Sequence, residues 1–258
     1  MPPQQSSSYA LPIAILLGFA IVAAVIFFSN FETTQSSTDT GAETNIANRL
    51  GGEPSTVVAE PVRELTDADF IRGNPNAPIQ LVTYTDFECS GCEGFHYAMN
   101  RLIQEYGMSG QVAWVQRHMP LEDIHPNSMT IANAAECVGS LAGNRAYWNF
   151  ADQVFDDRTP SERTDMDRLP EYLTDIDIDE AEWNSCVEDQ THHDYLTMTT
   201  EEAIDAGAAG VPYTIILAGG EQGSLNGPQP YVAMRDVVER LFSQIEEQYF
   251  DEDELEAL

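Results

Sequence analysis

The longest apolar segment of the chain lies near its N-terminus. Residues 10–28 read ALPIAILLGFAIVAAVIFF and carry no charge. At about 1.5 Å per residue, a helix of this length spans about 28 Å, which is close to the hydrocarbon thickness of a bilayer. The pattern therefore predicts a transmembrane helix over 10–28, preceded by an N-terminal tail at 1–9. A cleavable signal peptide is the alternative, but such peptides start with a basic region, and residues 1–9 contain no cation.

The next segment, 29–62, shows neither a helical nor a strand period. It is rich in Ser, Thr, Gly, Ala, Asn and Glu, which is typical of a flexible linker. We expect it to separate the membrane helix from a folded domain at 63–249. The last residues, 250–258, are mostly acidic, so we expect a solvated tail there after the close of a helix.

The folded domain starts with a strand that is followed closely by a helix. Residues 79–84 form an apolar, β-rich run after a proline, which predicts a buried strand. From Ser90 to Gly107 apolar residues recur at helical spacing, so we expect a helix there. A further strand is predicted at 213–217. The helices predicted between the strands begin after Asn127 as an N-cap and cover 128–143, 145–155, 166–173, 179–189 and 193–206.

Three aromatic residues of the predicted helix at 145–155 fall at helical spacing. They are Trp148, Phe150 and Phe155. An aromatic stripe of this kind can form a substrate surface, but it is more often part of a core. We therefore predict that the three side chains are buried.

The composition limits the function. The chain has 43 acidic residues against 11 basic ones, all of which are Arg, and its formal net charge is −32. Since phosphate contacts need a basic surface, nucleic acid is not expected as a partner. The hydrophobic content of 43% excludes a wholly disordered chain. A chain this acidic also repels itself at low salt, which suggests a saline setting or a strong demand for solubility.

The candidate chemistry lies at Cys89 and Cys92. They are spaced as CxxC where the predicted strand meets the predicted helix, so Cys89 lies at the helix N-terminus and Cys92 one turn inside it. The unpaired amides and the dipole of a helix start stabilise a thiolate, which lowers the pKa of the first cysteine. The second cysteine is near enough to close a disulfide with the first. This combination indicates a redox site.

Three segments carry a resemblance to a known family. They are NAPIQLVTYTDFECSGC, HMPLEDIHPNSMTIANAAECVGSLAGNRAYWNFADQVF and GAAGVPYTIILAGG. In this order, over about 65–245, they resemble the active-site turn, the start of the helical insertion and the cis-proline loop of DsbA-like thiol-disulfide oxidoreductases, in the thioredoxin superfamily. The resemblance implies an α+β, thioredoxin-like fold with a helical subdomain inserted at about 121–201. It also implies exchange of disulfides with protein substrates, and such exchange needs no nucleotide, flavin or metal cofactor.

The same resemblance assigns roles to Val211 and Pro212. It implies that the peptide bond between them is cis and that their loop lies against Cys89 and Cys92. Val211 would then offer its backbone groups to an extended substrate peptide, which is a way of binding many sequences. Because a bond before proline is usually trans, sequence statistics alone do not give the cis form.

The other two cysteines, Cys137 and Cys186, fall in predicted helices of the insertion. Each can be an inert buried thiol, or the two can form a structural disulfide. Some members of the family carry a second disulfide in this region, so the resemblance favours the bridge. A zinc site that includes Cys89, Cys92 and His96 is a further alternative, but no second CxxC is present and the spacing argues against it.

The residues beside the CxxC depart from the strong oxidants of the family. Those members have Pro-His between the cysteines, whereas this chain has Ser90 and Gly91 and lacks the histidine that helps to stabilise the thiolate. We therefore predict a weaker oxidant, with a Cys89 pKa between theirs and that of free cysteine. Glu88 either raises this pKa by repulsion or is solvated. No catalytic role is assigned to the histidines, of which two are expected to be exposed, His192 and His193.

These observations predict a single-pass, membrane-anchored thiol-disulfide oxidoreductase whose catalytic domain is extracytoplasmic, in a periplasm or outside the cell. We expect it to act in the oxidase direction. A reductase or isomerase on the same site, and a peptide-binding module without turnover, are the alternatives. The expected partners are protein thiols and disulfides, together with a membrane or extracytoplasmic redox partner.

Overall fold

The structure is a computed structural model that describes residues 61–158 and 164–256, with side chains as far as 247. The expected tail at 1–9, the expected transmembrane helix at 10–28 and nearly all of the expected linker at 29–62 lie outside the described residues. Within the described ranges, no helix combines the length and the apolar character needed to cross a membrane.

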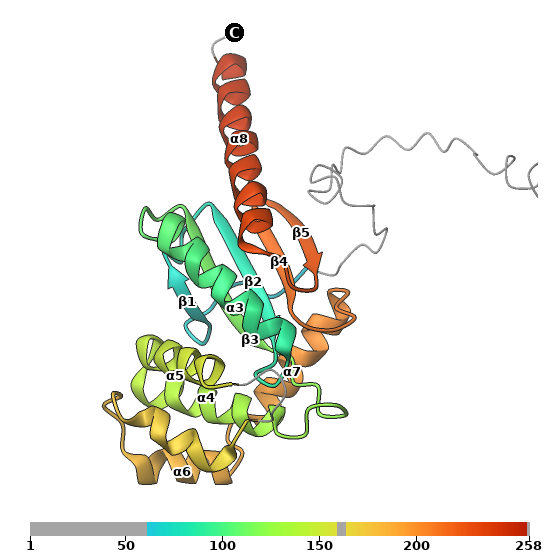
Figure 1. The fold of residues 1–258 in the computed structure, drawn as a ribbon. Coiled ribbons are helices and arrows are strands. Elements are labelled where there is room, and N and C mark those ends of the chain that lie inside the picture. Colours follow the sequence, from blue (N-terminus) through green and yellow to red (C-terminus); the bar gives the residue numbers. More distant parts are fainter. Residues whose placement is uncertain (1–60, 159–163, 257–258) are drawn as a thin grey trace, which may run out of the picture. The chain divides into compact units, whose positions relative to one another are not determined.

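A single mixed sheet of five strands forms the centre of the described fold (Figure 1). The strands lie in the order β1-β3-β2-β4-β5, and β2 and β3 pair in parallel while the other neighbours are antiparallel. The central strands are almost wholly buried because helices cover both faces of the sheet. The strands are β1 Phe70–Gly73, β2 Ile79–Thr85, β3 Val112–His118, β4 Tyr213–Ala218 and β5 Glu221–Asn226.

Helices follow β2, fill the connection between β3 and β4, and end the chain. After β2 come α3 Ser90–Leu102 and the π-helical turn η1 Ile103–Gly107. The connection from β3 to β4 holds α4 Ser128–Ala142, α5 Asn144–Asp156, the 3₁₀ helix η2 Met166–Leu173, α6 Glu180–Glu188 and α7 His193–Asp205. The last helix is α8 Tyr231–Glu256.

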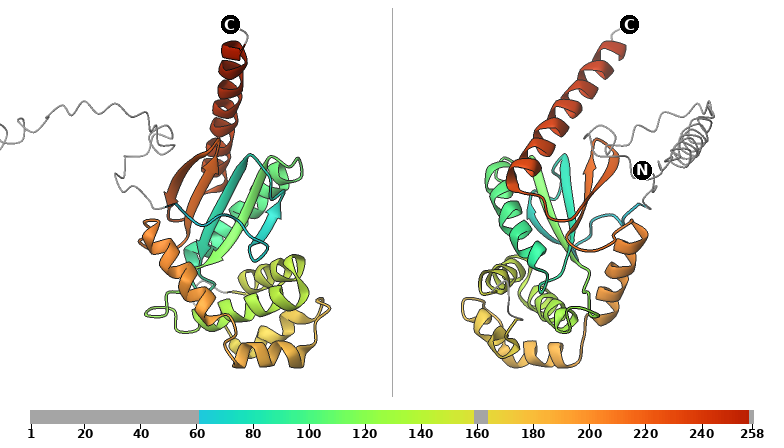
Figure 2. Two further views of the ribbon diagram at one scale, coloured as in Figure 1. Left: turned by 180° about the vertical axis from the view of Figure 1, so that it is seen from behind. Right: turned by 45° about the vertical axis from the view of Figure 1, so that its right-hand side comes forward.

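The two faces of the sheet are covered by different helices. Successive side chains of a strand point to opposite faces. Ile79 and Leu81 of β2 accordingly belong to a core that includes α3 and α8, whereas Val82 and Tyr84 belong to a second core that includes α7. The right-hand view in Figure 2 shows this arrangement, with α3 and α8 on one side of the sheet and α7 on the other.

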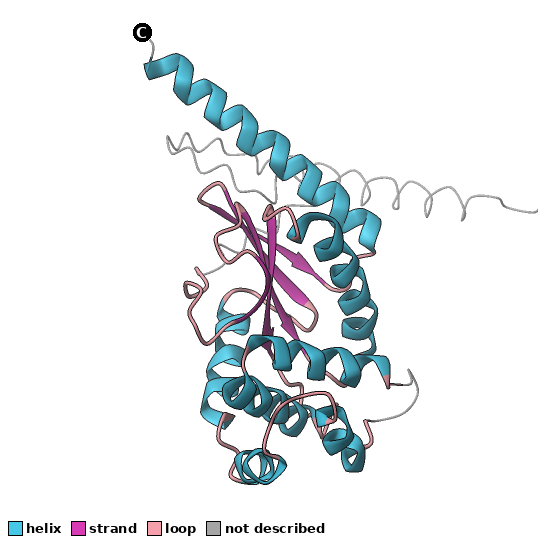
Figure 3. Ribbon diagram, turned by 90° about the vertical axis from the view of Figure 1, so that its left-hand side faces the viewer, coloured by secondary structure: helices cyan, strands magenta, loops and turns pink. Residues whose placement is uncertain are grey.

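The helical insertion packs beyond one end of the sheet (Figure 3). Phe70 of β1 stacks on Tyr147 of α5, with 3.7 Å between the ring centroids, and so joins the sheet to the insertion. The prediction that the aromatic residues of α5 are core is confirmed, because all three are almost wholly inaccessible: Trp148, Phe150 and Phe155.

Two expectations from the sequence need correction. The segment 250–258 was expected to be a tail beyond the last helix, but α8 continues to Glu256, since Glu and Leu are good helix formers. Asn127 does precede α4, but its side chain makes no capping bond to that helix. The strands β1, β3 and β5 were not singled out by the hydrophobic pattern.

Candidate redox site

The candidate site lies where β2 ends and α3 begins. Cys89 is the N-cap residue of α3, and its sulfur accepts a hydrogen bond from the backbone N–H of Cys92 at 3.3 Å. The backbone N–H of Cys89 donates to the carbonyl of Asp86 at 3.1 Å, which fixes the turn between strand and helix. The Cys89 sulfur therefore lies at the positive end of the α3 dipole.

The two sulfurs of this turn differ in exposure. Both cysteines are free, and Cys89 is half-buried. Cys92, one turn further along α3, is only 1% exposed. A thiol or disulfide from outside can therefore reach Cys89, while Cys92 is shielded by the core that α3 helps to form.

Electrostatics separate the two thiols further. The hydrogen bond from the Cys92 thiol, together with those from the backbone N–H groups of Cys92 and Gly91, lowers the pKa of Cys89 to about 6, although burial and the charge of Asp86 act in the opposite direction. Burial and the neighbouring Cys89 raise the pKa of Cys92 well above its ordinary value. At neutral pH the pair therefore carries one thiolate, on the accessible sulfur. A pKa of about 6 lies between those of the strong oxidants and of free cysteine, as the sequence predicts.

Asp86 is a buried carboxylate three residues before Cys89 that the sequence did not single out. Its Oδ1 accepts the backbone N–H of Glu88 at 2.7 Å, and its Oδ2 accepts the backbone N–H of Leu121 at 2.8 Å. Oδ2 also lies 2.9 Å from Nδ1 of His125. Asp86 therefore ties the redox turn to the segment that opens the helical insertion, and its charge disfavours the Cys89 thiolate.

Glu88 makes the second connection to the insertion. Its carboxylate accepts the backbone N–H of Asn127 at 2.9 Å and the Asn127 side-chain amide at 3.2 Å. Its backbone carbonyl accepts a hydrogen bond from Arg158 Nη2 at 2.5 Å. Of the two alternatives for Glu88, the solvated one is wrong, because the folded insertion covers the side chain and supplies hydrogen bonds in place of water.

The structure brings Val211 and Pro212 to the cysteine turn, although they lie more than a hundred residues further along the chain. Their peptide bond is cis, and the Cys89 thiol lies 3.6 Å from the carbonyl oxygen of Val211. Gly91 faces the same loop, since a Cβ on it would lie 3.7 Å from Pro212 Cδ and 3.4 Å from Pro228 Cγ. Pro228, between β5 and α8, is thus a further neighbour of the site that no motif indicated.

The histidines nearest the cysteines in sequence are engaged elsewhere. His96 is buried, and its Nε2 lies 2.7 Å from Asp152 Oδ1. His118 is also buried, and its Nε2 lies 2.9 Å from the Tyr147 hydroxyl. Burial lowers the pKa of both imidazoles, to about 3 for His118, so both are neutral at pH 7.

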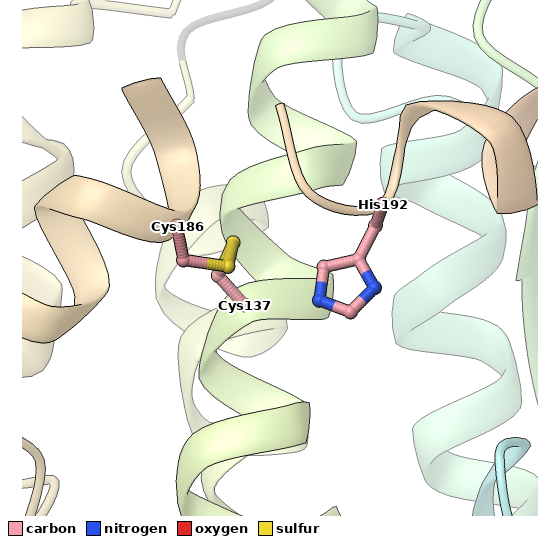
Figure 4. A group of neighbouring side chains, drawn as sticks. All are labelled: Cys137, Cys186 and His192. Carbon is pink, nitrogen blue, oxygen red and sulfur yellow. A yellow bond between two sulfur atoms is a disulfide. The ribbon is translucent and has the colours of Figure 1, made fainter. Parts of the chain in front are cut away.

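The second pair of cysteines lies in the insertion. Cys137 of α4 and Cys186 of α6 form a disulfide with an S–S distance of 2.00 Å, and His192, just before α7, lies beside it (Figure 4). His192 was expected to be exposed, but it is half-buried, and its Nε2 lies 3.2 Å from Ser140 Oγ. The long-range packing of the turn after α6 against α4 accounts for this difference.

The geometry at Cys89 and Cys92 fits thiol-disulfide exchange. An accessible thiolate can attack or leave a disulfide, and a buried thiol next to it can close or open the internal bond. The backbone carbonyl of Val211 adds a hydrogen-bond acceptor within reach of the reacting sulfur.

Comparisons with known proteins agree with this fold. The thioredoxin family model named Thioredoxin_4 matches residues 65–240, which is more than half of the chain. Among solved structures, α-DsbA1 of Wolbachia pipientis is 20% identical, with a TM-score of 0.61, and the match covers 72% of this chain and 96% of that one. Oxidised BdbD of Bacillus subtilis is 15% identical, with a TM-score of 0.61, and the match covers 72% of this chain and 98% of that one.

One relative found by sequence is an ion antiporter that matches this chain over only part of its length. The Na⁺/H⁺ antiporter NhaA 3 of Salinispora tropica is 35% identical over 113 residues, which make up 44% of this chain but only 16% of the antiporter. The chain thus spans about a sixth of the length of this curated relative. The family match and the structural likenesses extend over most of the described fold. The chain therefore belongs to the thioredoxin family, and its fold is that of the DsbA-like members.

Proposed function

We propose that this chain is a membrane-anchored, extracytoplasmic thiol-disulfide oxidoreductase that oxidises protein substrates through Cys89 and Cys92. The observation that carries the proposal is the asymmetry of the two thiols. Cys89 is accessible, with a pKa lowered to about 6, while Cys92 is buried, with a pKa raised well above its ordinary value. This is the arrangement that directs exchange through one sulfur and keeps the other as its internal partner.

In the proposed reaction, the enzyme begins with a disulfide between Cys89 and Cys92. A substrate thiolate attacks the Cys89 sulfur, which breaks the internal bond and leaves Cys92 as a thiolate that takes up a proton. A second substrate thiolate then attacks the sulfur of the first, forming the substrate disulfide and releasing Cys89 as a thiolate. The substrate loses two electrons and the enzyme gains them.

The low pKa of Cys89 supports the oxidase direction. A stabilised thiolate stabilises the reduced form of the site, so the oxidised form passes its disulfide on more readily. The charge of Asp86 opposes this effect, which supports a weaker oxidant than one with a fully stabilised thiolate. A membrane or extracytoplasmic redox partner must then reoxidise Cys89 and Cys92 after each turnover.

The loop at Val211 and Pro212 supports protein substrates. The Val211 carbonyl lies beside Cys89, and a backbone acceptor at this place can pair with an extended peptide regardless of its side chains. Such recognition suits an enzyme that acts on many unfolded chains.

The proposed location depends on the apolar segment 10–28, which is long enough to span a bilayer. The name of the antiporter relative lends support, because an Na⁺/H⁺ antiporter works across a membrane. The chemistry favours the outer side, where disulfides persist.

The direct test is to trap the mixed disulfide. In a full-length Cys92→Ala variant the resolving sulfur is absent, so we expect covalent adducts with cellular proteins on non-reducing gels, and their disappearance after reduction. The matched Cys89→Ala variant should form none. Absence of adducts with Cys92→Ala would instead indicate a peptide-binding module. In the unmodified chain, a mostly oxidised Cys89 and Cys92 pair in cells would support an oxidase, and a mostly reduced pair a reductase or isomerase.

A further inference from the structure

A group of potential metal ligands lies in the helical insertion, where the proposed exchange does not use them. Cys137 comes from α4, Cys186 from α6, and His192 from the residue before α7. Their two sulfurs and an imidazole nitrogen all lie within 4.8 Å of one another. Figure 4 shows the His192 ring beside the disulfide, with a ring nitrogen on the side that faces the sulfurs.

This convergence does not depend on the disulfide alone. Asn133, which is buried in α4, accepts the backbone N–H of His192 at 2.9 Å through its Oδ1. Its side-chain amide donates to the carbonyl of Val187, the residue after Cys186, at 3.3 Å. Asn133 therefore holds the chain on both sides of the turn between α6 and α7 against α4, with no sulfur involved.

The turn itself is closed by hydrogen bonds to Cys186. The backbone N–H and the hydroxyl of Thr191 both donate to the Cys186 carbonyl, at 3.2 Å and 3.1 Å. The His192 ring is held toward α4 by Ser140, whose Oγ lies 3.2 Å from Nε2. When the disulfide is opened, the bonds of Asn133 and Thr191 keep the three donor residues close together, and Zn²⁺ then replaces Ser140 as the partner of Nε2.

We propose that Cys137, Cys186 and His192 form a redox-gated zinc site, which binds Zn²⁺ when their disulfide is reduced and releases it when the disulfide forms. Two thiolates and one imidazole are ligands that Zn²⁺ prefers, and the charges of the thiolates balance that of the ion. Cys186 and His192 are half-buried, so a water molecule can occupy the fourth position.

Zinc binding requires the sulfurs of Cys137 and Cys186 to move apart by a small distance. Tetrahedral coordination with Zn–S bonds of about 2.3 Å places two sulfurs about 3.8 Å apart, compared with about 2.05 Å in any disulfide. The Cα atoms of the two cysteines are already 6.0 Å apart. Rotation of the half-exposed Cys186 side chain on the nine-residue helix α6 can supply the difference.

The gating step requires a thiol reductant. Two molecules of the reductant each give one hydrogen to a cysteine sulfur and become joined to each other as a disulfide, so the protein gains two electrons and two protons. Zn²⁺ then displaces the two thiol protons as it binds. In the reverse step a small-molecule disulfide takes up the two electrons and leaves as two thiolates, while Cys137 and Cys186 form their disulfide, so both sulfur ligands are lost and the ion is released.

The test uses the full-length chain with Cys89→Ser and Cys92→Ser, which removes the other dithiol. Zinc is titrated against a chromophoric chelator, with the protein either oxidised or reduced by a phosphine. We expect about one tightly bound Zn²⁺ per reduced chain and none per oxidised chain. His192→Ala should weaken binding by at least about tenfold, whereas His193→Ala, which changes the exposed neighbour, should leave it unchanged.

Circular dichroism of the same samples keeps the result interpretable if reduction loosens the fold. Zinc should then restore the helical signal and raise the melting temperature of the reduced chain, because binding free energy contributes to folding. Equal zinc affinity in the His192→Ala variant and its parent, or zinc binding to the oxidised chain, would overturn the proposal. So would a reduced chain that binds no zinc. None of these results bears on exchange at Cys89, whose failure the adduct test reports separately.

Discussion

The two cysteine pairs of this fold differ in spacing along the chain and in bonding. Cys89 and Cys92 are three residues apart on the first turn of one helix, and both are free. Cys137 and Cys186 are 49 residues apart, on two helices, and are joined. The first pair therefore constrains almost none of the chain when it closes, whereas the second closes a large loop of the insertion.

The difference shows what makes a cysteine reactive in this fold. The Cys92 thiol and the backbone N–H groups at the start of α3 lower the pKa of Cys89, whereas Cys137 lies in the middle of α4, where the helix has no free N–H groups to offer. Reactivity thus follows from a free neighbouring thiol, a position at a helix start and accessibility, acting together. Four comparisons between variants test this contrast.

Removal of the reactive sulfur should have the largest effect. We expect Cys89→Ser to lower the rate of disulfide transfer to a reduced model protein by about 10³-fold or more, because a hydroxyl cannot form the exchanged bond. The rate is measured by gain of activity during oxidative refolding of the substrate. Replacement of both Cys137 and Cys186 by Ala should leave transfer at a comparable rate, and loss of transfer in that variant would show that the second pair takes part in exchange.

The same double replacement should act on stability instead. A crosslink between residues 49 apart stabilises a fold by about 4 kcal/mol in the chain-entropy account. We expect Cys137→Ala with Cys186→Ala to lower the free energy of unfolding by about this amount in urea titrations. Cys89→Ser with Cys92→Ser should change it much less, and an equal loss in both variants would show that the first pair also stabilises the fold.

The local sequence pattern was sufficient to predict the part of the site that is built from residues close together in the sequence. The apolar spacing before and after Ser90 predicted the strand and helix that the structure shows as β2 and α3. Their junction puts Cys89 at a helix start with Cys92 one turn inside it, and the Cys92 thiol together with the backbone N–H groups there lowers the Cys89 pKa. The position of Val211 and Pro212 beside it came from the family resemblance, since no local pattern relates segments so far apart.

The parts that sequence did not predict depend on contacts between distant segments. β3 was not expected, since its second half carries Gln116, Arg117 and His118. These side chains are buried because far segments provide partners, such as Asp69, whose carboxylate accepts the Arg117 Nε–H at 2.8 Å. Glu88 is covered in the same way by Asn127. A polar residue with a partner from another part of the fold has no recognisable pattern along the chain.

A glycine two residues after the first cysteine of each pair gives a third contrast. A Cβ on Gly139 of α4 would overlap the ring of Phe70, which cannot turn aside because it is stacked on Tyr147. We expect Gly139→Ala to lower the free energy of unfolding by about 1–3 kcal/mol. A Cβ on Gly91 would meet Pro228 at 3.4 Å, so Gly91→Ala should change stability by less than about 1 kcal/mol. Urea titrations compare the two, and a reversed order would contradict the packing described here.

The smallest expected effect is electrostatic and concerns Asp86. Its negative charge raises the pKa of Cys89, so Asp86→Asn should lower that pKa below its present value of about 6. The asparagine oxygen can still accept the Leu121 N–H, whereas its NH₂ group cannot accept the Glu88 N–H. We expect about threefold faster alkylation of Cys89 at pH 5, measured with iodoacetamide on the reduced chain. Asp177→Asn, at an exposed position of the insertion, should leave the rate unchanged.

The stability of the reduced chain should depend on pH in a direction that follows from the lowered pKa of Cys89. A thiol whose pKa is lowered in the folded chain adds stability to the reduced form above that pKa, and the gain is lost as the pH falls through about 6. The melting temperature of the reduced chain relative to the oxidised chain should therefore rise from pH 5 to pH 8. In Asp86→Asn the rise should start at lower pH, because the thiolate forms earlier. A rise that starts at higher pH would mean that Asp86 acts mainly by holding the turn and the insertion together, and that the dipole of α3 alone does not control the Cys89 thiolate.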